Sequence, residues 1–300
     1  MDNILLLVEA PTILLQLLID GILVGAIFAL AAYGLALVWG VMNIINVAQG
    51  ELVILGGYIT YTLYDQFGLH PILSIPVAAA LLFVFGWSMY KLVIHRMVDK
   101  DLFTSLLATF GISILMQQLM NEIFGADVVS ADPDLGTLFL MNDEITITWI
   151  KLISFFIAIA MGILLVIFMK RSRLGQAIRA TAQNARAARI LGVNTDQVYA
   201  ATFGINAAIC GIAGSLVAMV WVLHPFIGLI YTVRSFMIVI VAGLGNLFGV
   251  ILAGLGLGGL ENTAGFILGA EFQSAFVFSL LVVILIVRNA LLRRKREYLK

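Results

Sequence analysis

Long apolar runs recur along the chain, and each is close to the length that a helix needs to cross a membrane. Eight of them cover residues 13–40, 50–67, 72–94, 103–124, 148–170, 197–223, 233–262 and 272–289. About 20 helical residues span the hydrocarbon core, whereas the strands of a membrane barrel are about ten residues long and alternate in polarity. Only 11% of the 300 residues are charged, and soluble domains carry about a quarter. The sequence therefore predicts an all-α, polytopic membrane protein that forms a single membrane domain over residues 1–300.

Lysine and arginine gather in three segments. Residues 91–100, 170–189 and 288–300 hold 15 of the 17 basic side chains, whereas residues 122–144 hold six acids and no base. Basic segments stay on the cytoplasmic side of a membrane. We therefore expect these three segments and the C-terminus on the cytoplasmic side of the membrane, and the acidic segment outside. No Lys or Arg precedes Lys91, which disfavours a cleaved signal peptide and predicts an N-terminus outside.

The seventh apolar run determines whether the number of crossings agrees with the sides expected for the charged segments. Eight full crossings from an outside N-terminus would leave the basic C-terminal segment outside. Residues 233–262 are too few for two full spans, but they contain Gly243, Gly245, Asn246 and Gly249, where a helix would break. We expect two half-membrane segments here, broken or re-entrant. Broken backbone within a membrane is tolerated where it is buried in protein or lines a water-filled cavity, so these four residues are candidates for the wall of a translocation pathway.

Three pairs of glycines have the four-residue spacing that lets transmembrane helices approach closely. They are Gly21 with Gly25, Gly245 with Gly249, and Gly254 with Gly258. We interpret all three pairs as helix-packing positions.

Polar residues follow the first apolar run. Asn43, Asn46 and Gln49 recur every three positions, and Glu51 comes shortly after them. On a helix the three amides would form one stripe, and an acid at the centre of a bilayer costs about 2.5–3.5 kcal/mol, so such residues usually face a cavity or a partner. Two interpretations remain open. These four residues are candidates for the wall of a hydrated pathway, or they belong to an interfacial turn with hydrogen bonds between helices.

Other polar positions have less specific interpretations. Asn206 is expected to hydrogen-bond to a neighbouring helix, and Glu261 with Asn262 is expected at the outer mouth. Arg234 and the pair His224-Pro225 flank a predicted outer turn, where we interpret them as an interface anchor and a helix break.

Residues 172–197 form an unusually polar segment. Ile178 and several alanines repeat at helical spacing, while Arg179, Gln183 and Arg186 form a neighbouring stripe, so an amphipathic helix with a shallow apolar face is expected. Gly192 would end this helix, and Asn194 would cap the next one. Small residues suit a groove on another protein, with the arginines at its rim. A helix that rests on anionic lipid head groups is the alternative.

Three motifs resemble one known family. The segment SRLGQAIRATAQNARAARILGVNTDQV is similar to the cytoplasmic coupling segment of permease subunits from branched-chain amino-acid ABC importers. The segments GLALVWGVMNIINVAQGELVILGGY and VIVAGLGNLFGVILAGLGLGGLENT resemble two other stretches of the same proteins. The Gly-Gly-x-Gly that is usual there is replaced by Ala242-Gly243-Leu244-Gly245. The resemblance covers nearly the whole chain.

The resemblance implies a complex of two permeases, two cytoplasmic ABC ATPase subunits and an extracytoplasmic solute-binding protein. The second permease is expected to be a different chain, and ATP with Mg²⁺ is expected on the ATPases, so this chain would hold no cofactor. The resemblance also implies that a coupling segment, residues 171–197, docks into the ATPase. The candidate coupling residues are Arg179, Ala185, Arg186, Ala188, Arg189, Leu191 and Gly192.

Other functional classes lack their signatures. The chain has no phosphate-binding loop of the form G-x-x-x-x-G-K-[ST], and no Ser/His or Cys/His arrangement indicates catalytic residues. Cys210 is the single cysteine and the three histidines are scattered, which disfavours a metal site. No nucleic-acid partner is expected.

The expected solutes are branched-chain or other hydrophobic amino acids, with urea, short amides and aromatic acids still open. An ion-coupled secondary transporter would need ionisable residues at mid-membrane, and Glu51 and Glu122 come closest to that position. A purely structural subunit is the third alternative.

Overall fold

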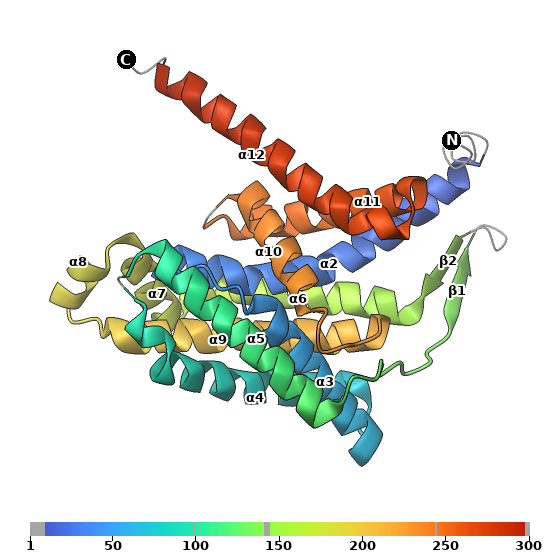
Figure 1. Ribbon diagram of the computed structural model, residues 1–300, viewed down its shortest axis with the longest axis horizontal. Coiled ribbons are helices and arrows are strands. Elements are labelled where there is room, and N and C mark those ends of the chain that lie inside the picture. Colours follow the sequence, from blue (N-terminus) through green and yellow to red (C-terminus); the bar gives the residue numbers. More distant parts are fainter. Residues whose placement is uncertain (1–9, 99, 141–144, 244, 298–300) are drawn as a thin grey trace.

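A computed structural model describes residues 10–98, 100–140, 145–243 and 245–297 (Figure 1). Its helices are α2 (Pro11–Met42), α3 (Gln49–Phe67), α4 (Pro71–Leu92), α5 (Leu102–Phe124), α6 (Trp149–Arg171), α7 (Arg173–Gln183), α8 (Ala185–Ile190), α9 (Thr195–Val220), α10 (Gly228–Ala242), α11 (Leu247–Leu268) and α12 (Gln273–Glu297). Two 3₁₀ turns, η1 (Ile94–Arg96) and η2 (Ala270–Phe272), and an antiparallel hairpin of β1 (Thr137–Leu140) and β2 (Ile145–Thr148) accompany them. The predicted helical architecture is confirmed.

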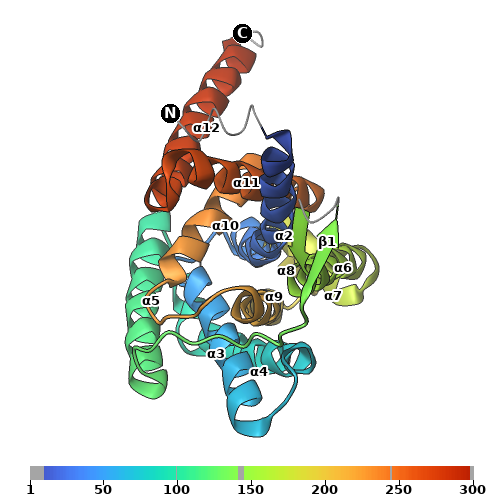
Figure 2. The same ribbon diagram turned by 90° about the vertical axis from the view of Figure 1, so that its right-hand side faces the viewer.

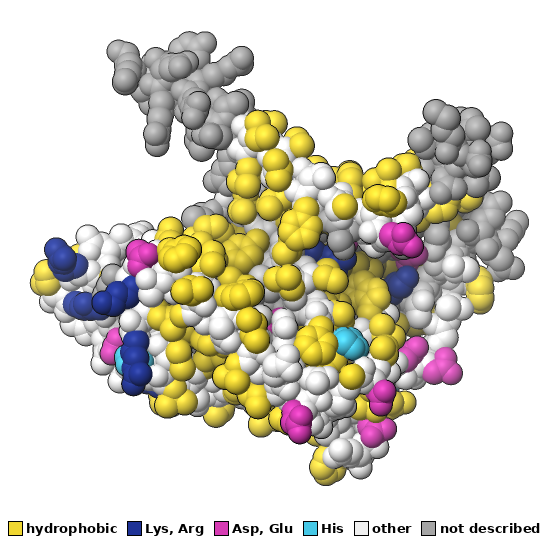
Figure 3. All heavy atoms as spheres, viewed as in Figure 1, with side chains coloured by type: hydrophobic (Ala, Val, Ile, Leu, Met, Phe, Trp, Pro, Cys, Tyr) yellow, Lys and Arg dark blue, Asp and Glu magenta, His cyan; other side chains and the backbone are white. Residues whose placement is uncertain are grey.

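Six helices of the described chain are long and apolar enough to cross a membrane: α2, α4 together with η1, α5, α6, α9 and α11. On the face shown in Figure 3, hydrophobic side chains form a broad belt between an end rich in Lys and Arg and an end where Asp and Glu gather. We call the first, which carries η1 and residues 170–196, the basic end. The second, which carries residues 125–136 and the hairpin, is the acidic end. Such a belt suits a chain surrounded by lipid, because lipid tails are as apolar as the side chains themselves.

α2 and α9 form the centre of the bundle, which Figure 2 shows nearly end-on. α9 packs against α2, α3 and α4, while α2 also packs against α6, α10 and α11. In the most apolar part of α9, 83% of the residues are buried. The surrounding helices therefore enclose α9 and the second half of α2, whereas residues 11–20 of α2 include no buried side chain.

α2 and α11 cross through backbone rather than side chains. A Cβ on Gly254 would lie 2.5 Å from the Cβ of Ala29, and a Cβ on Gly21 would lie 2.5 Å from the carbonyl oxygen of Gly258. Both distances are well below an ordinary contact of 3.4–4 Å. The packing role predicted for the pairs Gly21 with Gly25 and Gly254 with Gly258 is confirmed.

The break predicted in the seventh apolar run is confirmed. α10 ends at Ala242, and Gly243 and Gly245 both have φ of +82°, a region that side chains disfavour. Asn246 then starts α11 by accepting a hydrogen bond from the N–H of Gly249 (3.0 Å). The two pieces are not equal half-spans, because α10 has 15 residues and α11, with 22, is a full span. The helix-packing role predicted for Gly245 with Gly249 is wrong, since a Cβ on Gly245 would meet nothing within 4 Å.

The three amides after the first apolar run do not share a helix. α2 ends at Met42, Asn43 adopts the left-handed conformation (φ 52°), and irregular backbone leads to Gln49, the first residue of α3. The predicted helical stripe is therefore wrong. The side chain of Gln49 donates a hydrogen bond to the carbonyl of Ala31 (2.9 Å), eleven residues before the end of α2. Because an α-helix rises 1.5 Å per residue, eleven residues correspond to about 16 Å along α2. The first residue of α3 therefore lies about 16 Å from the end of α2, inside the bundle.

The basic segment forms two helices instead of the single one predicted. Asn184 has an extended conformation (φ −160°) that ends α7, and its side chain accepts a hydrogen bond from the N–H of Ala187 (2.9 Å) to cap α8. Asparagine side chains compete for backbone hydrogen bonds in this way. The helical spacing of the alanines on both sides of Asn184 did not indicate this break. Asn194 caps α9 as predicted and accepts a hydrogen bond from the N–H of Gln197 (3.1 Å).

Candidate translocation site

Two cavities follow α2 through the bundle, and α2, α6 and α11 contribute to the walls of both. The acidic-end cavity holds about 390 Å³ and reaches Asp20 and Phe28 of α2, whereas the basic-end cavity holds about 540 Å³ and reaches Ala36 and Gly40. Every residue of α2 between Phe28 and Ala36 is buried. At 1.5 Å per residue, about 12 Å of α2 is packed against protein between the two cavities, and we call this stretch the closed layer.

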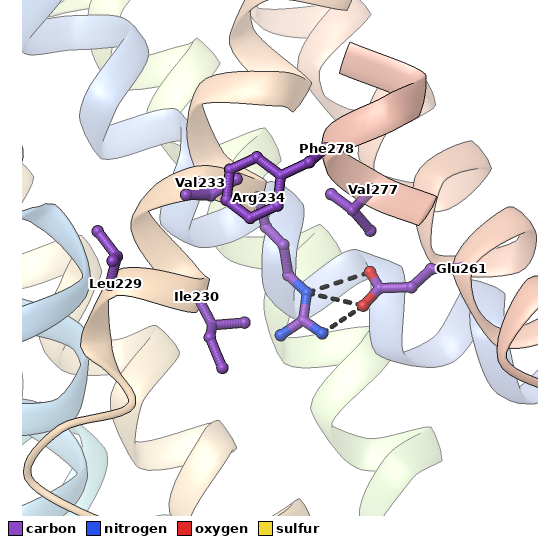
Figure 4. Close-up of a pocket in the computed structure, with 7 residues that line it drawn as sticks. All are labelled: Leu229, Ile230, Val233, Arg234, Glu261, Val277 and Phe278. Atoms are coloured by element: carbon purple, nitrogen blue, oxygen red, sulfur yellow. Dashed lines mark hydrogen bonds and ion pairs between the residues drawn. The ribbon is translucent and has the colours of Figure 1, made fainter. Parts of the chain in front are cut away.

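Four charged side chains from four helices line the acidic-end cavity. Lys151 of α6 donates to Asp20 of α2 with an N–O distance of 3.0 Å, and these side chains are 28% and 20% exposed. Arg234 of α10 and Glu261 of α11 form a second pair, in which Nε lies 2.9 Å and 3.1 Å from the two carboxylate oxygens and Nη2 also donates to Oε1. These two side chains are 15% and 2% exposed. The second pair is therefore largely withdrawn from water, and Figure 4 shows its carboxylate facing the guanidinium.

Aromatic rings hold Arg234 in place. Its Cζ lies 4.5 Å from the ring centre of Phe28 and 5.8 Å from that of Tyr231. Phe28 in turn stacks on Trp221 at the end of α9, with ring centres 5.6 Å apart and planes 4° from parallel. A guanidinium over an aromatic face is stabilised by about 0.5–2 kcal/mol. The guanidinium of Arg234 is therefore held both by the carboxylate of Glu261 and by the rings of Phe28 and Tyr231.

The basic-end cavity lies between α2 and α7, the first helix of the basic segment. Lys170 of α6 and Arg179 of α7 line it together with Gly245, while most of its remaining wall is apolar. The glycine break between α10 and α11 thus lies beside α7. Among the four pathway candidates at this break, Gly245 lines the cavity and Gly243, Asn246 and Gly249 adjoin it along the chain. Their role in transport stays a prediction.

A buried polar cluster surrounds the start of α3. Glu51 is fully buried, and its Oε1 accepts hydrogen bonds from Nε2 of Gln117 (2.7 Å) and Oγ of Ser113 (3.1 Å), the central residue of α5. The N–H of Gly50 donates to Oγ1 of Thr232 (2.8 Å), so the first turns of α3 and α10 meet beside this carboxylate. The second carboxylate oxygen of Glu51, Oε2, is also buried, and no hydrogen bond to it is recorded within the described chain.

The four candidates before and within this cluster have different surroundings. Nδ2 of Asn46 donates to Oε1 of Gln49 (3.3 Å), and Nε2 of Gln49 also lies 3.1 Å from the sulfur of Cys210 in α9. Asn43 is exposed. Asn43, Asn46, Gln49 and Glu51 are absent from the walls of the two cavities. Gln49 and Glu51 form hydrogen bonds to neighbouring helices, as the second interpretation expects, but they are fully buried inside the bundle and do not lie in an interfacial turn. A role in transport stays a prediction for all four.

The comparison with known proteins agrees with this architecture. The family described as branched-chain amino acid transport system, permease component, matches residues 17–285. The chain belongs to this family. The permease is 29% identical over 290 residues to the high-affinity branched-chain amino acid transport system permease protein LivH of Salmonella typhimurium, covering 91% of this chain and 93% of that one. It is 30% identical over 287 residues to BraD, the corresponding protein of Pseudomonas aeruginosa, covering 91% and 94%. No solved structure matches it.

The candidate coupling residues of the permease are divided between the surface and the interior. Leu191 is 83% exposed, as is its neighbour Ile190, and Gly192 turns the chain there with φ of +87°. Ala188 is 3% exposed and Ala185 is half-buried, so both face the permease itself.

Each arginine of the basic segment has its own setting. Arg186 is exposed. Arg179 lines the basic-end cavity, and Nε of Arg189 donates to Oγ1 of Thr195 at the start of α9 (2.6 Å). Arg189 therefore ties α8 to the next span.

The charged residues of the acidic-end cavity were not assigned to a site by the sequence. Arg234 was interpreted as an interface anchor and Glu261 as a residue of the outer mouth, and the structure joins them across 27 positions. The available signal was an acid and a base within apolar runs, because such residues need a partner in a membrane. Asn206 was expected to bond across helices, but the hydrogen bond recorded for it comes from Cys210 of its own helix, at 3.8 Å.

Proposed function

We propose that the permease is the transmembrane subunit of an ATP-driven importer and forms, as one membrane domain, part of the translocation pathway for branched-chain or other hydrophobic amino acids. The supporting observation is the pair of cavities along α2, one toward each end of the bundle, with a closed layer between them. Alternating access requires a site that communicates with one side of the membrane at a time. A rearrangement that opened the layer between Phe28 and Ala36 on one side would meet this requirement.

The charge distribution supports an orientation in the bacterial inner membrane. Lys and Arg side chains favour the cytoplasmic side, so the basic end, with α7 and α8, faces the cytoplasm and the acidic end faces outward. α2 starts on the side of the acidic end and α12 ends on the side of the basic end (Figure 1). The N-terminus is therefore outside and the C-terminus is cytoplasmic. The acidic end is then the surface that receives solute from an extracytoplasmic binding protein.

The exposed pair Ile190 and Leu191 supports docking of an ATPase at the basic end. Two aliphatic side chains that are 83% exposed in a polar, cytoplasmic segment favour a partner that covers them. The complex contains two ATPase subunits, which hold ATP and Mg²⁺, and a second, different permease. The permease itself performs no catalysis.

Purification of the tagged permease in mild detergent, with identification of the proteins that accompany it, tests this proposal. An ATPase should accompany the wild type. The Leu191→Glu variant should recover about ten-fold less ATPase, or still less, because a charge in a docking groove is costly. The side chain of Leu191 is exposed, so this change should not unfold the permease. Phe139→Glu is the matched control, since Phe139 is 58% exposed in the hairpin at the opposite end.

Two results would contradict the proposal. Equal recovery of the ATPase by both variants would remove the docking role of the α8 end. A stable permease without any ATPase, together with uptake driven by an ion gradient, would indicate a secondary transporter instead.

A further inference from the structure

The charges of the acidic-end cavity balance. Asp20 and Glu261 are opposed by Lys151 and Arg234, and each acid already contacts a base. A cavity for an anion or for a cation would be expected to carry an excess of the opposite charge. Two separate acid–base pairs instead complement a solute that carries one charge of each sign.

A contribution to the stability of the fold is a weak explanation for the Arg234–Glu261 pair. Replacing a buried ion pair with apolar side chains of similar volume is often neutral or stabilising, and charged residues within membrane spans commonly mark solute pathways. The hydrogen bonds recorded for Arg234 use Nε and Nη2. A guanidinium has five N–H donors, so the two on Nη1 have no bond recorded within the described chain and are available to a carboxylate.

The same cavity has an apolar wall. Val24, Phe28, Trp221 and Tyr231 line it beside the four charged residues. A smaller apolar pocket of about 70 Å³ adjoins the ion pair, and its lining adds Leu229, Ile230, Val233, Val277 and Phe278 to Arg234 and Glu261 (Figure 4). The larger volume, about 390 Å³, lies within the range of ~300–1,000 Å³ that small-molecule sites occupy.

We propose that the acidic-end cavity is a transit site that binds a free, zwitterionic amino acid with an aliphatic side chain. Arg234 receives the carboxylate through Nη1, Asp20 receives the ammonium group, and the aliphatic side chain lies against Phe28 and Trp221. The proposal rests on the proposed function and adds a binding site within the permease to it. It gives the Arg234–Glu261 pair a role in recognition, in which Glu261 and Phe28 hold the guanidinium ready for the solute.

The permease offers a favourable background for a thiol-protection experiment. Cys210 is its single cysteine and is fully buried, so an introduced cysteine would be the reactive one. Val24→Cys places a thiol in the cavity wall. Phe67→Cys places one at the acidic end of α3, where Phe67 is 74% exposed and away from the cavity. Both variants are labelled with a small cationic methanethiosulfonate, in the assembled transporter in lipid nanodiscs, without ATP or binding protein.

L-Leucine at ten times its dissociation constant should slow the labelling of the Val24→Cys variant about ten-fold, as mass action requires, and leave the Phe67→Cys variant unchanged. 4-Methylpentanoate lacks the ammonium group of leucine, and 3-methylbutylamine lacks the carboxylate, so neither should protect at the same concentration. Adding Arg234→Met together with Glu261→Leu should abolish protection while Val24→Cys stays reactive, since replacing both members leaves no unpaired buried charge.

Several outcomes would overturn the proposal. These are a Val24→Cys variant that is not labelled, labelling that leucine does not slow, equal protection by 4-methylpentanoate or by 3-methylbutylamine, and protection that survives removal of the ion pair. The assay uses neither ATP hydrolysis nor ATPase recovery. Absent protection with intact ATP-driven uptake would therefore remove the transit site alone and leave the proposed function standing.

Discussion

The Gly254→Ala variant should be less stable than the wild type, because α11 contacts α2 through backbone at this position. The added Cβ would lie 2.5 Å from the Cβ of Ala29 and 2.9 Å from its Cα, against an ordinary contact of at least 3.4 Å. Relieving the shorter contact requires a separation of about 0.9 Å, the difference between 3.4 and 2.5 Å. Overpacking of this kind costs about 1–3 kcal/mol, and a gap of this size forfeits about a quarter to a half of the dispersion energy along the crossing.

Alanine also has a higher helix propensity than glycine, by about 1 kcal/mol. The net loss expected for Gly254→Ala is therefore up to about 2 kcal/mol. Gly256 lies two positions further along α11 on another face, where a Cβ would meet nothing within 4 Å. Gly256→Ala keeps the gain in propensity without the clash, so it should be as stable as the wild type or more stable.

Thermal unfolding of the purified permease in one detergent, followed by intrinsic fluorescence, measures the difference. At about 2–4 °C per kcal/mol, Gly254→Ala should lower the Tm by up to about 8 °C and should unfold at a lower temperature than Gly256→Ala, which should not lower the Tm. Because both variants alter the same helix, effects of detergent on α11 are shared. A Gly254→Ala variant as stable as Gly256→Ala would refute the close crossing of α2 and α11.

Three further perturbations have expected outcomes. Glu51→Leu should lower the stability by about 1–3 kcal/mol, because it removes the acceptor of the buried hydroxyl of Ser113 and of the half-buried amide of Gln117. Glu51→Gln should lower it less, and thermal unfolding distinguishes the two variants. Asn194→Ala should cost about 1 kcal/mol through loss of the cap on α9, and Asn194→Gly only a few tenths, measured in the same way. Asp20→Asn should change the Tm little, because the side chains of Asp20 and Lys151 are 20% and 28% exposed and such pairs contribute about 1 kcal/mol or less. The same variant should nevertheless slow transport in a reconstituted uptake assay.

The break between α10 and α11 was open to prediction because its causes are local. Gly243 and Gly245 adopt positive φ, and Asn246 caps the helix that follows, and each of these preferences belongs to the residue itself. The close crossing at Gly254 and Gly258 was predictable for the same reason, since spacing on one helix places both on one face. The prediction that Asn43, Asn46 and Gln49 form a stripe was wrong, because three-residue spacing places side chains on one face only where the backbone is helical. Here Asn43 ends α2 and the chain returns into the bundle.

The sequence by itself determined the class of the protein. Apolar runs of membrane length, segregated basic and acidic segments and the glycine break follow from the hydropathy, charge and flexibility of single residues, none of which needs a partner. The tertiary structure decided which distant residues form a site. Arg234 and Glu261 meet because α10 and α11 pack around α2, and Asp20 and Lys151 join them from two other helices. A single sequence does not contain such pairings, because a buried charge requires a partner without specifying where along the chain that partner lies.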